Sequence, residues 1–160
     1  MSSENTIAAR VLTEKNLMVL LVAGVIAEAV LELISWIAFP AILGKPMRPD
    51  ILVSDLTRSV LGLEMVRWLA ITIHLALGFI IFPVIYAFAR EAWKFRNWIP
   101  ASLVYGVVLW AVAQTTLAPL AGRPFMLGFI GYTWGSLINH IIFAVIIGYI
   151  VNRHMPLETD

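Results

Sequence analysis

The sequence predicts an all-α membrane protein, a four-helix transmembrane bundle built from two tandem helical hairpins. Three observations lead to this prediction: an apolar composition, four long apolar runs, and a series of motifs that occurs twice. Of the 160 residues, 61% are hydrophobic and 13% are charged, with a mean hydropathy of +0.89. A soluble domain is about 45–50% apolar and about a quarter charged. The apolar surplus therefore excludes a soluble enzyme domain and a disordered chain.

The charged residues and the cysteine count exclude further classes. The chain has 11 Lys and Arg against 10 Asp and Glu, so it lacks the basic excess that nucleic-acid binding requires. It contains no Cys, which excludes a disulfide scaffold, an iron–sulfur cluster and a thiolate zinc site.

Each of the four apolar runs can cross about 30 Å of hydrocarbon as a helix. The runs are continuous, without the alternation of a transmembrane β-barrel. We expect one transmembrane domain over residues 1–160, with spans at about 17–43, 68–89, 98–120 and 132–151. An even number of spans puts both termini on one side. The short connection with Arg90, Lys94 and Arg96 favours cytoplasmic termini.

Prolines interrupt the spans at defined places. Pro40 and Pro119 are expected to end helices near the close of the first and third spans. Pro83 lies inside the second span and is expected to kink it.

The longest connection, residues 44–67, also has a helical pattern. After Pro49, apolar residues recur at helical spacing and polar residues fill the other side. We expect a short helix at about 50–63. It either lies on the outer membrane surface or packs over the bundle.

The chain repeats a series of motifs in order. Residues 24–30 (GVIAEAV) resemble 106–112 (GVVLWAV), and each run leads to a Pro and then to Gly-Lys-Pro or Gly-Arg-Pro. Trp68 precedes His74 by six positions, as Trp134 precedes His140. This pattern predicts two hairpins in the same orientation, related by a pseudo-two-fold axis along the membrane normal. Matching residues then lie at equal depth.

Several polar side chains fall inside these apolar spans, where a charge costs at least a few kcal/mol. They are expected to face the bundle interior, either as a proton or ligand site or as hydrogen bonds that hold helices together. The candidate site residues are Glu28, Glu32, His74, Gln114, Thr115 and His140.

The two histidines permit a further hypothesis. Two imidazoles on separate helices at one depth can ligate a b-type haem from both sides, so His74 and His140 are candidate haem ligands. The alternative is a pair of histidines hydrogen-bonded between helices. No Glu-x-x-His pair of the kind used by dinuclear bundle sites occurs, and we expect no metal site.

Two resemblances arise at these residues. The Gly-rich first span, His74 followed by Gly78, and His140 in the last span resemble a family of uncharacterised four-span bacterial inner-membrane proteins. This resemblance implies a fold and a location only.

Residues 24–30 resemble the first helix of small multidrug-resistance transporters, which implies a proton- and substrate-binding role for Glu28. Those transporters are much shorter and lack the long first connection and the paired histidines.

Three functions follow as hypotheses. The first is a non-catalytic accessory or assembly subunit of a larger membrane complex, because no nucleophile triad, phosphate loop or nucleotide fingerprint is present. The second is a haem electron-transfer protein, and the third is a proton-coupled small-molecule transporter using Glu28. The expected surroundings are the lipid bilayer of a bacterial inner membrane and a protein partner or a second copy of the chain.

Overall fold

The structure, a computed structural model, describes residues 3–94 and 96–157 and has no strand among them. Four of its helices are apolar and long enough to span a membrane. They cover the four predicted spans, and the chain is accordingly a multi-pass membrane protein. The four helices run over Glu14–Leu43, Arg67–Ala92, Trp98–Leu120 and Gly131–His154.

Three of the four spans contain one π-helical turn between two α-helical pieces. The first span consists of α2 (Glu14–Leu33), η1 (Ile34–Ala38) and α3 (Phe39–Leu43). The second consists of α5 (Arg67–Ala76), η2 (Leu77–Ile81) and α6 (Phe82–Ala92), and the third of α7 (Trp98–Val112), η3 (Ala113–Leu117) and α8 (Ala118–Leu120). The fourth span, α9 (Gly131–His154), is a continuous α-helix.

Each π-helical turn ends two residues before a proline. Pro40, Pro83 and Pro119 occupy the second position of the α-helical piece that follows η1, η2 and η3. A proline lacks the N–H that a regular helix needs and its ring clashes with the carbonyl four residues earlier. One extra residue in the preceding turn relieves both problems. The prediction that Pro40 ends a helix is therefore wrong, since α3 continues to Leu43. Pro119 lies one residue before α8 ends at Leu120, close to the predicted end.

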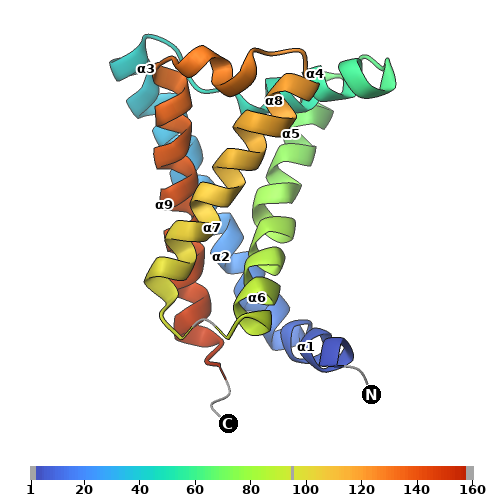
Figure 1. The fold of residues 1–160 in the computed structure, drawn as a ribbon, viewed down its shortest axis with the longest axis vertical. Helices are drawn as coiled ribbons and strands as arrows, with labels where there is room; N and C mark the ends of the chain where they lie inside the picture. Colours follow the sequence, from blue (N-terminus) through green and yellow to red (C-terminus); the bar gives the residue numbers. More distant parts are fainter. Residues whose placement is uncertain (1–2, 95, 158–160) are drawn as a thin grey trace.

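Three shorter segments close the two ends of the bundle. α4 (Pro49–Leu61) lies across one end, which we call the α4 end, while α1 (Ser3–Val11) and the close of α9 lie at the opposite end (Figure 1). The turn η4 (Phe125–Phe129) contains residues with positive φ and also lies at the α4 end. The expected helix at about 50–63 is present as α4. Its position relative to a membrane surface stays a prediction.

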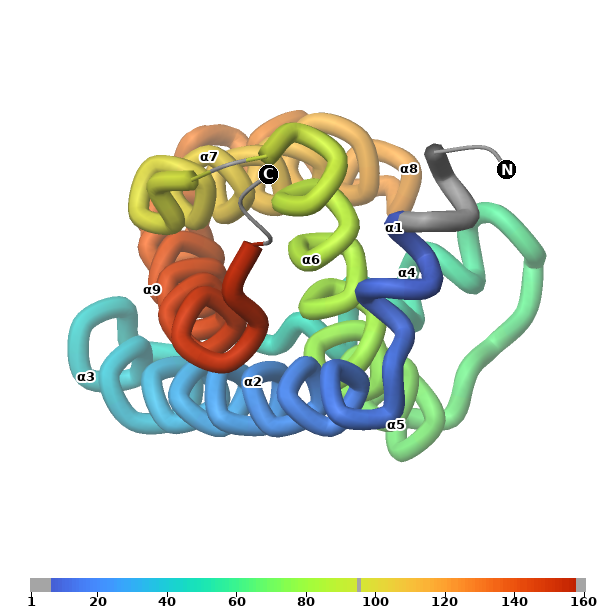
Figure 2. Tube along the Cα trace, turned by 90° about the horizontal axis from the view of Figure 1, so that it is seen from below, coloured from blue at the N-terminus to red at the C-terminus, as the bar shows by residue number. Residues whose placement is uncertain are grey.

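The spans approach closely at two glycines. A Cβ atom on Gly24 of α2 would lie 2.3 Å from the backbone oxygen of Phe79, and one on Gly106 of α7 would lie 2.8 Å from that of His140. Gly24 thus makes room for a carbonyl whose usual partner, the N–H at position 83, is missing because that residue is a proline. α9 packs against both α2 and α7, and the second span packs against α2 through η2 and α6 (Figure 2).

A buried arginine ties the bundle together at the end opposite α4. Arg90 is 3% exposed and donates from Nη1 to the backbone oxygen of Met155 at 2.6 Å, beyond the end of α9. Next to this contact, the Tyr86 hydroxyl lies 3.1 Å from Ser102 Oγ, which links α6 to α7. The outward faces of the spans carry exposed large apolar side chains such as Ile37 and Ile80, as a lipid-facing surface requires.

Gly24→Ala is expected to lower the free energy of unfolding by about 1–3 kcal/mol, because the added methyl group would force two helix backbones apart. Denaturant titration in mixed micelles measures this change. Ala29→Val is the control, since Ala29 lies on the exposed face of the same helix. Equal stability of Gly24→Ala and the wild type would contradict the close contact.

Candidate functional site

A cavity of about 510 Å³ lies between the four spans at the α4 end. Its walls are mainly apolar, with Leu31, Leu77, Leu109 and Phe143 from the four spans. α4 covers it with Leu52 and Leu56, which lie four residues apart and so share the face of the helix that turns toward the bundle. Polar side chains gather on the wall in two groups.

The first polar group combines two carboxylates with an imidazole. Glu28 and Glu32 are four residues apart on α2, so they lie on one face of the helix, and His74 of α5 faces them. His74 Nε2 lies 2.7 Å from Glu28 Oε1 and 3.8 Å from Glu32 Oε1. Donor atoms of the three residues all lie within 4.8 Å of one another. We call these three residues the carboxylate–imidazole cluster.

The Glu28 carboxylate occupies space that a glycine leaves open. The residue is 2% exposed, and a Cβ atom on Gly78 would lie 2.3 Å from its Oε2 atom. The other carboxylate oxygen, Oε1, lies 2.7 Å from His74 Nε2, which is the distance of a close ion pair or hydrogen bond between the two side chains.

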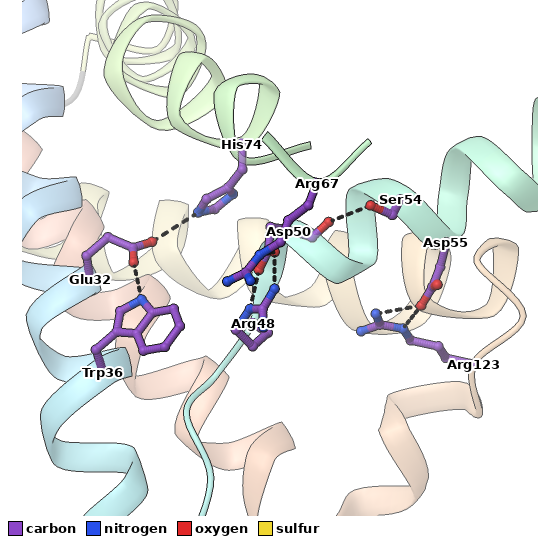
Figure 3. Close-up of polar contacts among 9 residues, drawn as sticks. All are labelled: Glu32, Trp36, Arg48, Asp50, Ser54, Asp55, Arg67, His74 and Arg123. Carbon is purple, nitrogen blue, oxygen red and sulfur yellow. Dashed lines mark hydrogen bonds and ion pairs between the residues drawn. The ribbon is translucent and has the colours of Figure 1, made fainter. Parts of the chain in front are cut away.

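Glu32 connects the cluster to an ionic group at the α4 end, as Figure 3 shows. Trp36 donates its indole N–H to Glu32 Oε2 at 2.7 Å, and the Arg48 guanidinium lies 5.8 Å from the centre of the Trp36 ring. Arg48 in turn binds Asp50 through two hydrogen bonds, one of 2.8 Å from Nε. A second cavity of about 150 Å³ lies beside this group, and Glu32, Arg48 and His74 line both cavities.

The second polar group lies on η3 and α9. Gln114 Nε2 donates to Ser136 Oγ at 3.3 Å, and Asn139 Nδ2 donates to Ser35 Oγ at 3.3 Å. His140 Nδ1 lies 2.7 Å from the backbone oxygen of Ser136. A carbonyl only accepts, so Nδ1 carries the ring hydrogen and Nε2 remains a lone-pair donor. The side-chain oxygens of Gln114 and Asn139 are buried without a hydrogen-bond partner.

The structure brings most of the predicted site residues to one cavity. Glu28, Glu32, His74, Gln114 and His140 all line it. Thr115 does not: it is exposed, and its hydroxyl donates to the backbone oxygen of Ala111 in its own helix at 2.8 Å. Successive residues point about 100° apart around a helix, so Thr115 turns away when its neighbour Gln114 faces inward.

Sequence reasoning did not select four polar residues of the site, namely Ser35, Trp36, Ser136 and Asn139. Ser136 and Asn139 precede His140 by four positions and by one, inside an apolar run, which is a signal that could have found them. Trp36 follows Glu32 by four positions, at the spacing of neighbours on a helix face.

The two histidines differ in what their ring nitrogens contact. His140 keeps Nε2 available, but His74 Nε2 lies against Glu28. Axial ligation of one haem by both residues would first require the His74–Glu28 contact to separate. The haem hypothesis stays a prediction.

No protein-family model, curated protein or solved structure matches this chain. The resemblances stated for the sequence therefore stay predictions.

Asp50 gives the α4 end a dependence on pH. Its hydrogen bonds from Arg48 hold its pKa below the ordinary value of a carboxyl group. A lowered pKa means that Asp50 stabilises the fold fully above its unfolded value, about pH 3.9, and that this contribution is lost as the pH falls through the folded pKa.

Asp50→Asn is accordingly expected to lower the melting temperature in detergent near neutral pH. The difference from the wild type should shrink as the pH is lowered below about 4, where the wild-type carboxylate is itself protonated. Melting curves from pH 3 to 7 measure this trend. A difference that grows at low pH would contradict the assignment. Glu64→Gln serves as a control on an exposed ion pair.

Proposed function

We propose that this protein binds a small, mainly apolar molecule within the membrane-spanning bundle. The cavity of about 510 Å³ carries this proposal. Sites for small molecules are commonly about 300–1,000 Å³, mostly apolar, with a few converging polar groups. Both features are present, and the cavity lies between helices, where bundle proteins bind ligands.

The arrangement of the polar groups supports a ligand with a polar end. The carboxylate–imidazole cluster offers carboxyl and imidazole groups to the cavity, while Gln114 and Asn139 offer amide oxygens without a hydrogen-bond partner. A buried acceptor without a partner costs about 1–3 kcal/mol. A bound molecule that donates hydrogen bonds would recover part of this cost. Entry from the α4 end is supported by the second cavity, which shares Glu32 and His74 with the first.

The same site supports transport as a second candidate function. A proton-coupled small-molecule transporter using Glu28 needs a substrate cavity beside an intramembrane carboxylate, and the cavity lies directly against Glu28. The accessory-subunit hypothesis has no comparable support among the described residues. The exposed apolar faces of the spans suit lipid and a protein partner equally well.

We further propose a bacterial inner-membrane location with both termini in the cytoplasm, so that α4 lies at the outer surface. The supporting observation is the cluster of Arg and Lys in the connection between the second and third spans. In this orientation α4 would rest at the membrane interface as well as cover the cavity. Its exposed apolar residues Ile51, Val60 and Leu61 support such a position.

We also propose that the two hairpins descend from a duplicated unit. The first and third spans share a π-helical turn before a proline, followed by a left-handed glycine: Gly44 has φ 76° and Gly122 has φ 75°. In each hairpin, a glycine of the odd-numbered span meets the backbone of the even-numbered one. The second and fourth spans are less alike, because only the second contains a π-helical turn.

Ala113→Trp tests ligand binding by filling the cavity, since Ala113 lines it. N-phenyl-1-naphthylamine is the probe, and its saturable binding to protein in nanodiscs is followed by energy transfer from tryptophan, with empty nanodiscs as the blank. We expect saturable binding to the wild type and its loss in Ala113→Trp.

Val112→Trp is the matched control, because the neighbouring Val112 is 46% exposed on the outer face. It should bind the probe as the wild type does. Equal binding by Ala113→Trp and Val112→Trp, or no saturable binding to the wild type, would reject the cavity as a binding site.

A further inference from the structure

We propose that Glu28, Glu32 and His74 form a binding site for a divalent first-row transition-metal ion. The first observation is geometric: one donor atom from each of the three residues lies within 4.8 Å of the others. The residues come from two different spans, so the fold itself brings them together. Two carboxylates with one imidazole suit Mn²⁺, Fe²⁺, Co²⁺ or Zn²⁺.

The second observation concerns the buried carboxylate oxygen. Glu28 is 2% exposed, and its Oε1 atom lies 2.7 Å from His74 Nε2. A buried carboxylate oxygen and a ring nitrogen from another span thus converge on one point. Both atoms are of the kind that ligates first-row metal ions.

The third observation is the charge inside the cavity. Glu28 and Glu32 place two carboxyl groups at a mainly apolar cavity, where an uncompensated charge would be costly. The other cations that line the cavity, Arg48 and Arg123, are paired with Asp50 and Asp55. One divalent ion neutralises both glutamates while His74 remains a neutral ligand.

The surroundings hold the ligands in place. Gly78 leaves the space that the Glu28 carboxylate fills, and the indole N–H of Trp36 fixes Glu32 Oε2. Such outer hydrogen bonds orient metal ligands and raise affinity. Three protein ligands leave at least one coordination position for water or a bound molecule, as in catalytic rather than structural zinc sites. All three residues line the cavity of about 510 Å³, so that position can be reached from it.

This proposal replaces the expectation from sequence that the chain holds no metal. The Glu-x-x-His pair that sequence reasoning sought is absent, but Glu28 and Glu32 at helical spacing supply two carboxylate ligands on one face. The third ligand comes from another span. The site is independent of the organic ligand proposed above, since it concerns the cluster alone.

Titration with Co²⁺ tests the site, because its visible absorption reports ligand type and coordination number. The full-length protein is purified in detergent, freed of any affinity tag and treated with a chelator first. We expect visible bands that saturate at one Co²⁺ per chain and disappear when Zn²⁺ is added. Glu28→Gln and His74→Gln should each weaken Co²⁺ binding by about tenfold or more. Trp36→Phe should weaken it less, through the lost hydrogen bond to Glu32.

His140→Gln is the matched control, because His140 is a second intramembrane histidine in the same cavity but outside the cluster. Its Co²⁺ affinity should equal that of the wild type. If circular dichroism shows that Glu28→Gln does not fold, Glu32→Gln takes its place, because Glu32 is only half-buried. Absence of saturable bands in the wild type would overturn the site. An unchanged Co²⁺ affinity in His74→Gln would also overturn the site. So would a loss of Co²⁺ affinity in His140→Gln as large as that in His74→Gln. None of these results depends on the naphthylamine probe, so the two proposals fail separately.

Discussion

The structure depends on keeping two carboxylates, Glu28 and Glu32, out of lipid. An ionised side chain in hydrocarbon is costly, so the face of α2 that carries them must turn toward the bundle axis. Once that face is fixed, His74 and Trp36 lie within reach of the two carboxylates, and Gly78 must remain without a side chain. These contacts fix the rotation of each of the first two spans about its own helix axis.

The π-helical turns in the spans also contribute to the cavity. The π-helical turns η1 and η3 lie in the halves of their spans nearer the α4 end, and η2 lies at the middle of the second span. Each contributes a residue to the cavity wall. Each adds a residue to a turn and changes which side chains face inward beyond it. Ser35 of η1 and Gln114 of η3 are both buried and line the cavity. Prolines, which would otherwise weaken the spans, thus direct polar residues inward where partners are present.

Much of the architecture and part of the candidate site could be predicted from the sequence. Apolar runs of sufficient length identified the spans, because crossing hydrocarbon imposes a length and a composition that any single sequence reveals. The cost of burying polar groups identified Glu28, Glu32, His74, Gln114 and His140 as inward-facing. Thr115 shows the limit of this reasoning. A hydroxyl group can donate its hydrogen bond to a backbone carbonyl of its own helix, as Thr115 does. A threonine in a span can therefore face either the bundle or the outside.

The sequence by itself determined that the chain crosses a membrane several times and that its polar residues lie inside. These properties follow from local composition and from the cost of polar groups in lipid. Only the tertiary structure decided that Glu28 and Glu32 meet His74, that Asn139 reaches Ser35, and that α4 covers a cavity. Such contacts depend on the rotation and depth of separate helices. Those are set by side-chain packing and by prolines that shift the helical register, and no pattern within one span records them.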